Sequence, residues 1–250
     1  MKIVNILVLL FFPFLFLGLI NRVKSFWAGR QGPSIFQPLF DFLKLLKKDI
    51  IIGQTTSWVF QLSPIIGFSS ILIAGLLVPL TGHVSILSFE YNFILFSYII
   101  ALGKFFSVIA AMDTGSSFEG MGASREITFS SLVEPGFFIL LGSLALFTKS
   151  AAFQDIFSLT GQHTSLSCLI ITLSVMALYI MLLVESCRVP VDDPNTHLEL
   201  TMIHEVMILD NSGPDLGFIM YGAGMKMVII GSLIANIILP VTLKPGYYLL

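Results

Sequence analysis

Apolar residues fill six long runs of the chain, and each run is long enough to cross a bilayer as an α-helix. A spanning helix needs about 20 predominantly apolar residues, and a helix satisfies its own backbone hydrogen bonds in lipid. We therefore predict an all-α fold, a polytopic bundle of about six spanning helices that forms a single membrane domain over residues 1–250. The predicted spans cover residues 3–21, 59–80, 93–112, 127–148, 166–185 and 218–241.

Composition places the chain in lipid and excludes other classes of protein. Hydrophobic residues make up 56% of the sequence and charged residues only 11%, whereas a soluble domain carries roughly a quarter charged residues. The net charge of −2 argues against nucleic acid as a partner, because binding it needs a basic surface. The two cysteines, Cys168 and Cys187, lack the paired spacing of an iron–sulfur or zinc site, so no metal or cofactor is predicted in this chain.

Lysine and arginine are distributed unevenly between the two sides of the predicted bundle. Cytoplasmic loops of membrane proteins are enriched in both residues, so the richer side is predicted to be cytoplasmic, with the N-terminus outside. The chain is then a multi-pass protein of the cytoplasmic membrane. The richer side holds Arg22, Lys24, Arg30, Lys44, Lys47, Lys48, Arg125 and Arg188, and the other side holds Lys2, Lys149 and Lys244.

The first long connection, residues 22–58, contains a turn and then an amphipathic pattern. Gly29, Gly32 and Pro33 predict the turn, and after Pro38 apolar residues alternate with charged ones as on a two-faced helix. Such a helix suits the membrane interface on the cytoplasmic side. A generic surface anchor and a docking strip for a partner both fit this pattern, and periodicity does not separate them.

The second polar connection, residues 113–126, is rich in glycine and serine and is predicted to be a loop. It lacks the arrangement of a phosphate-binding loop. Ser124 is predicted to cap the next helix, and Glu126 to lie in its first turn, where the helix dipole favours an acid. That local role accounts for Glu126 but leaves Asp113 and Glu119 unexplained.

The third polar connection carries most of the acids between Glu185 and Asp215. Thr196 and Glu199 have capping-box spacing, which predicts a short cytoplasmic helix over residues 197–210. His204-Glu205 resembles the start of a zinc-protease motif, but Ile208 stands where the second histidine would be needed. We therefore reject metal binding here.

Three ionisable residues, Lys104, Glu134 and Lys226, lie inside predicted spans at a similar depth. Each is about eight residues from the cytoplasmic end of its helix, or roughly 12 Å at 1.5 Å per residue. Charges in a bilayer usually pair or line a wet cavity. Glu134 could pair with Lys104 or Lys226 and only fix packing; alternatively, Glu134 and Glu185 titrate and relay protons.

Three motifs in order resemble the membrane subunit of the group 4, energy-converting nickel–iron hydrogenases, such as formate hydrogenlyase. The related subunit 1 of respiratory complex I belongs to the same superfamily. The short turn of the first motif and the DTGS and GASRE elements of the second favour the hydrogenase branch, whereas the pattern from Glu185 to Asp192 is shared. The motifs are GRQGPSIFQPLFDFLKLLKK, MDTGSSFEGMGASRE with Glu134-Pro135, and ESCRVPVDDPNTHLEL with HEV and SGPDL.

This resemblance implies a subunit that anchors a hydrophilic redox arm on the cytoplasmic side of the membrane. The implied partners are membrane lipid, the large and small hydrogenase subunits, a ferredoxin-like iron–sulfur subunit and antiporter-like membrane subunits. Those partner chains would hold the iron–sulfur clusters and the nickel–iron centre. Family members usually have about two further spanning helices, so the last helices of the family are expected to be missing here.

The expected mechanism is electrostatic coupling, because a charge near the cytoplasmic face changes the proton affinity of carboxylates within several ångströms. Arg125 and Arg188 are expected to order loops by pairing with acids. The proposed coupling residues are Glu134, Glu185, Lys104, Lys226, Asp113, Glu119, Asp192, Glu199 and Glu205. The proposed interface residues are Gly32, Pro33, Gln37, Pro38, Asp41 and Lys44.

Three alternatives stay open. A quinone-reducing subunit of an NADH dehydrogenase like complex I would have the same shape. A stand-alone ion transporter would need inverted repeats with matching broken helices, and the sequence has one proline-interrupted charged helix, around Glu134. A passive scaffold is the third, and the electron donor and the pumped ion, proton or sodium, are not determined by this chain.

Overall fold

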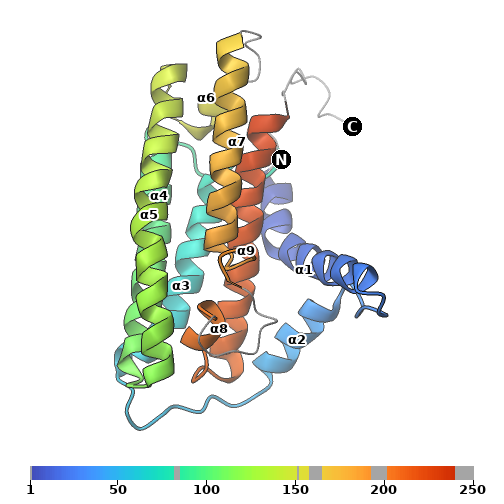
Figure 1. The fold of residues 1–250 in the computed structure, drawn as a ribbon, viewed down its shortest axis with the longest axis vertical. Helices are drawn as coiled ribbons and strands as arrows, with labels where there is room; N and C mark the ends of the chain where they lie inside the picture. The colour runs from blue at the N-terminus through green and yellow to red at the C-terminus, as the bar shows by residue number, and fades with distance from the viewer. Residues whose placement is uncertain (1, 82–84, 151, 158–164, 193–201, 240–250) are drawn as a thin grey trace.

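The computed structural model describes residues 2–81, 85–150, 152–157, 165–192 and 202–239, and this part of the chain is helical without strands. Six helices are long and apolar enough to span a membrane, which confirms the predicted all-α bundle (Figure 1). They are α1 (Lys2–Trp27), α3 (Trp58–Leu77), α4 (Asn92–Asp113), α5 (Ser117–Thr148), α7 (Ser165–Glu185) and α9 (Gly213–Ile238). Three shorter helices are α2 (Gln37–Leu46), α6 (Phe153–Ile156) and α8 (His204–Met207).

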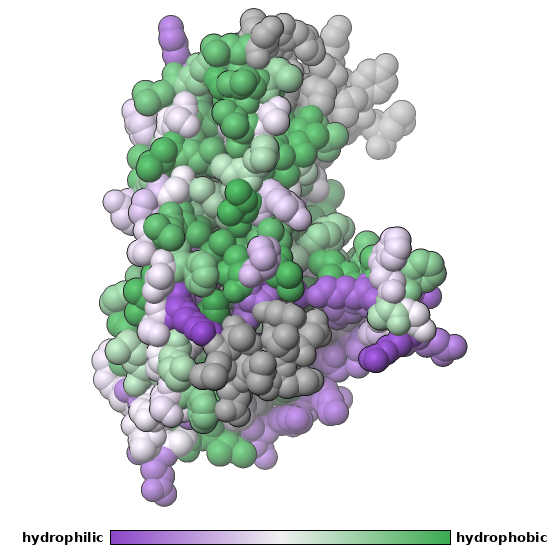
Figure 2. All heavy atoms as spheres, viewed as in Figure 1, coloured by the Kyte–Doolittle hydropathy of each residue, from purple (hydrophilic) through white to green (hydrophobic). Residues whose placement is uncertain are grey.

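The outer surface of the bundle is apolar, as a lipid-facing surface should be. On α5, Leu132, Ile139 and Leu146 recur every seven residues and are 71–82% exposed. Figure 2 shows mostly hydrophobic atoms over the upper part of the molecule and hydrophilic atoms toward the lower end. Because apolar side chains so exposed would be unfavourable in water, this surface fits a bilayer or membrane partners.

Helix α2 confirms the predicted amphipathic helix, with Pro38 near its N-terminus. Phe42 faces inward and packs against Phe14 of α1 and Tyr221 of α9, at ring centroid distances of 5.5 and 5.1 Å. Tyr221 also donates a hydrogen bond to the Leu10 carbonyl, 2.6 Å away, close to the proline at position 13 in α1. These contacts hold α2 beneath α1, which slants away from the other spanning helices (Figure 1).

Helix α7 ends deeper in the bundle than its neighbours, with α8 beneath its end (Figure 1). Glu185, its last residue, meets Lys104, which lies nine residues before the end of α4 at Asp113. At 1.5 Å per residue, α7 therefore stops roughly 13 Å short of the end of α4. Glu185 is the last residue of its helix, as the predicted span 166–185 gives it, and its side chain is buried among the other helices.

The predicted helix over residues 197–210 is wrong in its described part. Residues 193–201, including the predicted capping box, lie outside the described residues, and beyond them α8 forms a single turn. Two carboxylates from other parts of the chain accept hydrogen bonds from the backbone of this segment. Asp192 accepts a hydrogen bond from the Ile203 N–H at 2.9 Å, and Glu119 accepts one from the Asp210 N–H at 2.9 Å. The two N–H groups therefore donate to side chains of distant residues instead of to backbone carbonyls of a longer helix.

The predicted loop over residues 113–126 is also wrong, since α5 begins at Ser117 and Ser124 lies inside it. Tertiary packing outweighs the weak helix propensity of glycine and serine here. A Cβ on Gly122 would lie 3.0 Å from the Ile203 carbonyl oxygen and from Met207, so glycine lets α8 approach α5 closely. The predicted cap at Ser124 therefore does not exist, because the helix starts two turns earlier.

Candidate functional site: a buried charge cluster between two cavities

Four charged side chains from four spanning helices meet inside the bundle. The Lys104 ammonium lies 2.5 Å from a Glu185 carboxylate oxygen and 3.3 Å from one of Glu126. The Lys226 ammonium lies 3.1 Å from the other Glu185 oxygen. The side chain of Glu185 is 1% exposed and that of Lys104 is 5% exposed. Lys104, Glu185 and Lys226 are therefore brought together as a buried network, although Glu126 was not expected in it.

The charges of this network balance when all four groups are ionised, with two lysines against two glutamates. A buried ion is costly unless it is paired and hydrogen-bonded, so each member depends on its neighbours. The four residues also line a cavity of about 100 Å³, large enough for several water molecules. A network with a hydrated cavity can gain or lose a proton when a nearby charge changes.

Of the two roles left open for Glu134, the structural ion pair is not formed, since no ion pair joins it to Lys104 or Lys226 in the described part of the chain. It lies eight residues after Glu126 on α5, and Ser130 lies halfway between them. Residues four apart share one face of a helix, so the three form a polar stripe. Glu134 interacts electrostatically with both lysines and is an additional carboxylate beside the balanced network. This spacing was the sequence signal that could have identified Glu126.

A larger cavity of about 350 Å³ lies between α1, α2, α9 and the segment around α8. Its walls combine apolar side chains from α1 and α9 with a polar end. Within that end, Gln37 donates a hydrogen bond to Asp41 at 2.9 Å. The polar lining residues are Asn21, Gln37, Asp41, Ser186, Arg188, Asp192, His204, Glu205 and Tyr221, and Pro38 also lines this cavity. The structure thus brings part of the predicted interface set and part of the predicted coupling set together.

Three of the predicted coupling acids hold the backbone in place. Asp113 accepts hydrogen bonds from the N–H and the hydroxyl of Ser57, at 2.7 and 2.8 Å, which fixes the start of α3. Glu119 and Asp192 bind the α8 segment through the N–H groups of Asp210 and Ile203. Asp113 and Glu119 lie apart from the two cavities, whereas Asp192 lines the larger one.

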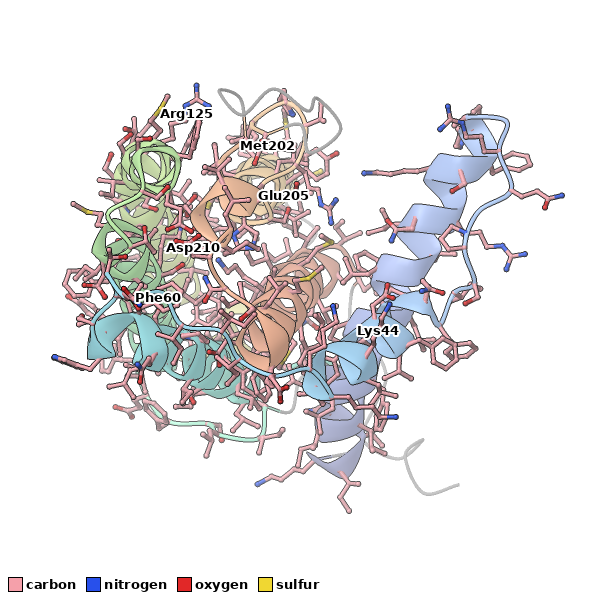
Figure 3. All side chains as sticks on the ribbon, turned by 90° about the horizontal axis from the view of Figure 1, so that it is seen from below. Lys44, Phe60, Arg125, Met202, Glu205 and Asp210 are labelled. Carbon is pink, nitrogen blue, oxygen red and sulfur yellow. The ribbon has the colours of Figure 1, made fainter. Side chains whose placement is uncertain are left out.

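Other predicted residues have surface positions or lie outside the described residues. In Figure 3, Glu205 lies on the α8 segment, Lys44 on α2 and Arg125 on α5. No ion pair between described residues involves Arg125 or Arg188, so their expected role in ordering loops stays a prediction. Gly32 and Pro33 lie in the turn after α1, and Glu199 is outside the described residues.

Two titratable side chains outside the spans share the wall between the cavities. Burial raises the pKa of the Cys187 thiol to about 12, so this thiol stays protonated at neutral pH. Burial also lowers the pKa of His204, with Lys226 acting in the same direction and Glu126 against it. Within the described residues, no three His, Cys, Asp or Glu side chains form a group that could hold a metal ion.

Comparisons with known proteins agree with this architecture. The NADH dehydrogenase family matches residues 1–247. The chain is 31% identical to hydrogenase-4 component C of Escherichia coli, covering 93% of this chain and 73% of that protein. It is 28% identical to formate hydrogenlyase subunit 4 of the same organism, covering 89% and 72%, and 24% identical to an NADH-quinone oxidoreductase subunit of Anaplasma phagocytophilum, covering 92% and 74%.

A solved structure shares the fold at lower sequence identity. A chain of the membrane-bound sulfane sulfur reductase, an archaeal respiratory membrane complex, aligns with a TM-score of 0.77 and 22% identity, covering 95% of this chain and 77% of that one. The resemblance noted in the three sequence motifs is thereby confirmed. The chain belongs to the NADH dehydrogenase family of membrane proteins, among relatives that include subunits of hydrogenase-4, formate hydrogenlyase and NADH-quinone oxidoreductase.

Proposed function

We propose that this chain is the membrane-embedded subunit of a respiratory-type nickel–iron hydrogenase complex. It anchors the redox arm and couples electron transfer, ending in hydrogen evolution, to proton or sodium translocation. The observation that carries the proposal is the buried network of Lys104, Glu126, Glu185 and Lys226, which lies within spanning helices beside a cavity. The similarity to hydrogenase-4 component C and formate hydrogenlyase subunit 4 supports the choice of complex.

The coupling works through charge in this proposal. A charge that appears near the larger cavity changes the proton affinity of the network, because electrostatic interactions are strong where water is scarce. Glu134 carries the response along α5, since it interacts with all four members without pairing with the lysines. Asp192 and Glu205, together with Asp41, form the acidic lining of the larger cavity.

The positions of lysine and arginine support the orientation of the subunit. The end of the bundle with α2 and α8 faces the cytoplasm, and the N-terminus faces outward. The hydrogenase large and small subunits and a ferredoxin-like subunit bind at that end and hold the nickel–iron centre and the iron–sulfur clusters. Antiporter-like subunits bind within the membrane. The described residues of this chain offer no cluster-binding group of their own.

The test is Glu134→Gln, which removes the charge and keeps the shape. We expect the complex to assemble and proton uptake by inverted membrane vesicles, driven by hydrogen evolution, to fall at least about tenfold, in line with losses of proton-transfer groups elsewhere. The matched control is Glu90→Gln, an exposed carboxylate at the opposite end of the bundle, which should leave uptake unchanged. Undiminished proton uptake in Glu134→Gln would refute the relay.

A quinone-linked enzyme is the second candidate, and the larger cavity favours it. This cavity joins apolar walls to a polar end, the arrangement that an amphiphilic ring with a long tail needs. A subunit of an NADH-quinone oxidoreductase is among the relatives. The two candidates separate when the complex is purified in mild detergent through this chain. A nickel–iron large subunit supports the first, and bound quinone with NADH-oxidising chains supports the second.

A further inference from the structure

The two cavities are separated by a thin wall of shared residues. Both are lined by Ser186, Cys187, His204, Ile208 and Ala223. One side of this wall faces the buried network, and the other faces Asp41, Arg188 and Asp192. A proton that moves directly from one cavity to the other would pass among these five side chains.

His204 is the wall residue that can exchange protons near neutral pH. Ile208 and Ala223 have no polar side-chain atom, and the Ser186 hydroxyl donates to the Leu182 carbonyl. The thiol of Cys187 stays protonated, because burial raises its pKa to about 12. Imidazole, by contrast, has an unperturbed pKa close to neutrality.

The geometry leaves the His204 ring available for proton transfer. Its Nε2 atom is buried and has no hydrogen-bond partner among the described residues. Its backbone is fixed at the start of α8, where the N–H groups of Ile203 and His204 point at the Asp192 carboxylate, at 2.9 and 3.4 Å. A buried ring nitrogen that no described residue occupies can accept a hydrogen bond from water, or a proton, from either cavity.

Charged groups face His204 from both cavities. Lys226 of α9 and Glu126 of α5 act on it from the smaller cavity, and Asp192 and Arg188 act on it from the larger one. Lys104 and Glu185 line the smaller cavity with them, and Glu205 lines the larger. These groups include both positive and negative charges, so a change of charge in either cavity alters the proton affinity of the imidazole.

We infer that His204 transfers protons between the larger cavity and the buried charge network, an inference that rests on the proposed function. A carboxylic acid in the larger cavity, Glu205 or Asp192, gives its proton to the neutral imidazole and becomes a carboxylate. The imidazolium then gives a proton to the Glu126 carboxylate and returns to the neutral form. Water molecules bridge these steps where the groups are not in direct contact.

The test uses the complete complex in inverted membrane vesicles, with hydrogen evolution and proton uptake measured together. In His204→Gln we expect assembly to persist and proton uptake per hydrogen formed to fall at least about tenfold, the scale of a lost proton-transfer residue. Ile208→Val is the matched control, because it alters the same wall without an ionisable group, and its ratio should equal that of the wild type.

A second variant distinguishes a proton-transfer role of His204 from a packing role. It also tests the inference if His204→Gln fails to assemble. In His204→Ala, added imidazole should restore proton uptake, whereas thiazole, a ring of similar shape that stays unprotonated at neutral pH, should not. An unchanged uptake ratio in His204→Gln, or equal restoration by both rings, would overturn the role of His204. If the wild-type vesicles take up neither protons nor sodium during hydrogen evolution, the proposed function itself is refuted.

Discussion

At the scale of single residues, Glu185 is the member on which the buried network depends. It binds both lysines, and its side chain is 1% exposed. Removing one partner of a buried ion pair costs about 3–5 kcal/mol, because the other charge is left without compensation. The two lysines would then face each other with Glu126 alone to offset them.

We therefore expect Glu185→Gln to destabilise the protein by about 3–5 kcal/mol. Combining it with Lys226→Met should cost less than the sum of the single changes, because the double variant removes charges of opposite sign. Thermal unfolding of the purified complex, analysed as a double-mutant cycle, measures the coupling. Strictly additive effects would show that the pair contributes nothing, and Glu90→Gln serves as the surface control.

His204 makes a second prediction at this scale, on pH and stability. Burial lowers the pKa of His204 in the folded protein, so between the folded and unfolded values the unfolded chain binds more protons. Stability is therefore complete above the unfolded pKa and is lost as the pH falls below it. The midpoint of thermal unfolding should decrease between pH 7 and pH 5, and by less in His204→Gln. Parallel pH profiles for the two proteins would contradict this assignment.

At the scale of elements, the path of the chain into α9 depends on a glycine. Gly213 has a φ of +57°, and a Cβ there would lie 2.7 Å from the carbonyl oxygen of Asp49. Both the backbone conformation and the contact disfavour a side chain. This close approach ties the connection after α2 to the start of α9, as does the hydrogen bond from the Ile51 N–H to the Ser212 hydroxyl at 2.8 Å.

We expect Gly213→Ala to destabilise the protein by about 1–3 kcal/mol, the usual cost of one strained backbone position. Gly231, on the same helix, is the matched control, because a Cβ there meets nothing within 4 Å. Gly231→Ala should be neutral or should stabilise α9 by up to about 1 kcal/mol, since alanine is the better helix former. Equal midpoints of thermal unfolding in both variants would contradict the strain argument.

At the scale of the whole molecule, the unequal distribution of basic residues predicts orientation. Lys44 lies exposed on α2, and Glu90 lies exposed at the opposite end. A membrane-impermeant maleimide should label Lys44→Cys in inverted vesicles only, and Glu90→Cys in spheroplasts only. The parent chain, with its two native cysteines, provides the labelling background. The reverse pattern would place the N-terminus in the cytoplasm.

Features that depend on residues close together in the sequence were predicted better than features that depend on contacts between distant residues. The six spans and α2 follow from hydrophobic runs and periodicity. Their largest errors in bounds are at the start of α5, the end of α1 and the start of α9, where each helix extends past the apolar run into polar residues. The failures, around Ser124 and over the described residues 202–210, occur where glycine contacts and distant carboxylates override local propensity. Glu126 was assigned a local role because its partner Lys104 lies on another helix.

The sequence by itself determined the membrane class, the all-helical fold and the amphipathic helix, because apolar run length and helix period are local properties. The predicted depth of about eight residues from the cytoplasmic end was wrong for Glu134 and Lys226, because their helices begin earlier, at Ser117 and Gly213. Only the tertiary structure decided which charges pair, since four helices contribute the buried network. It also decided that α7 ends inside the bundle, and that His204 stands between two cavities. Such contacts between distant segments arise from packing, and residue spacing along the chain shows at most which helix face is polar, not which charges meet.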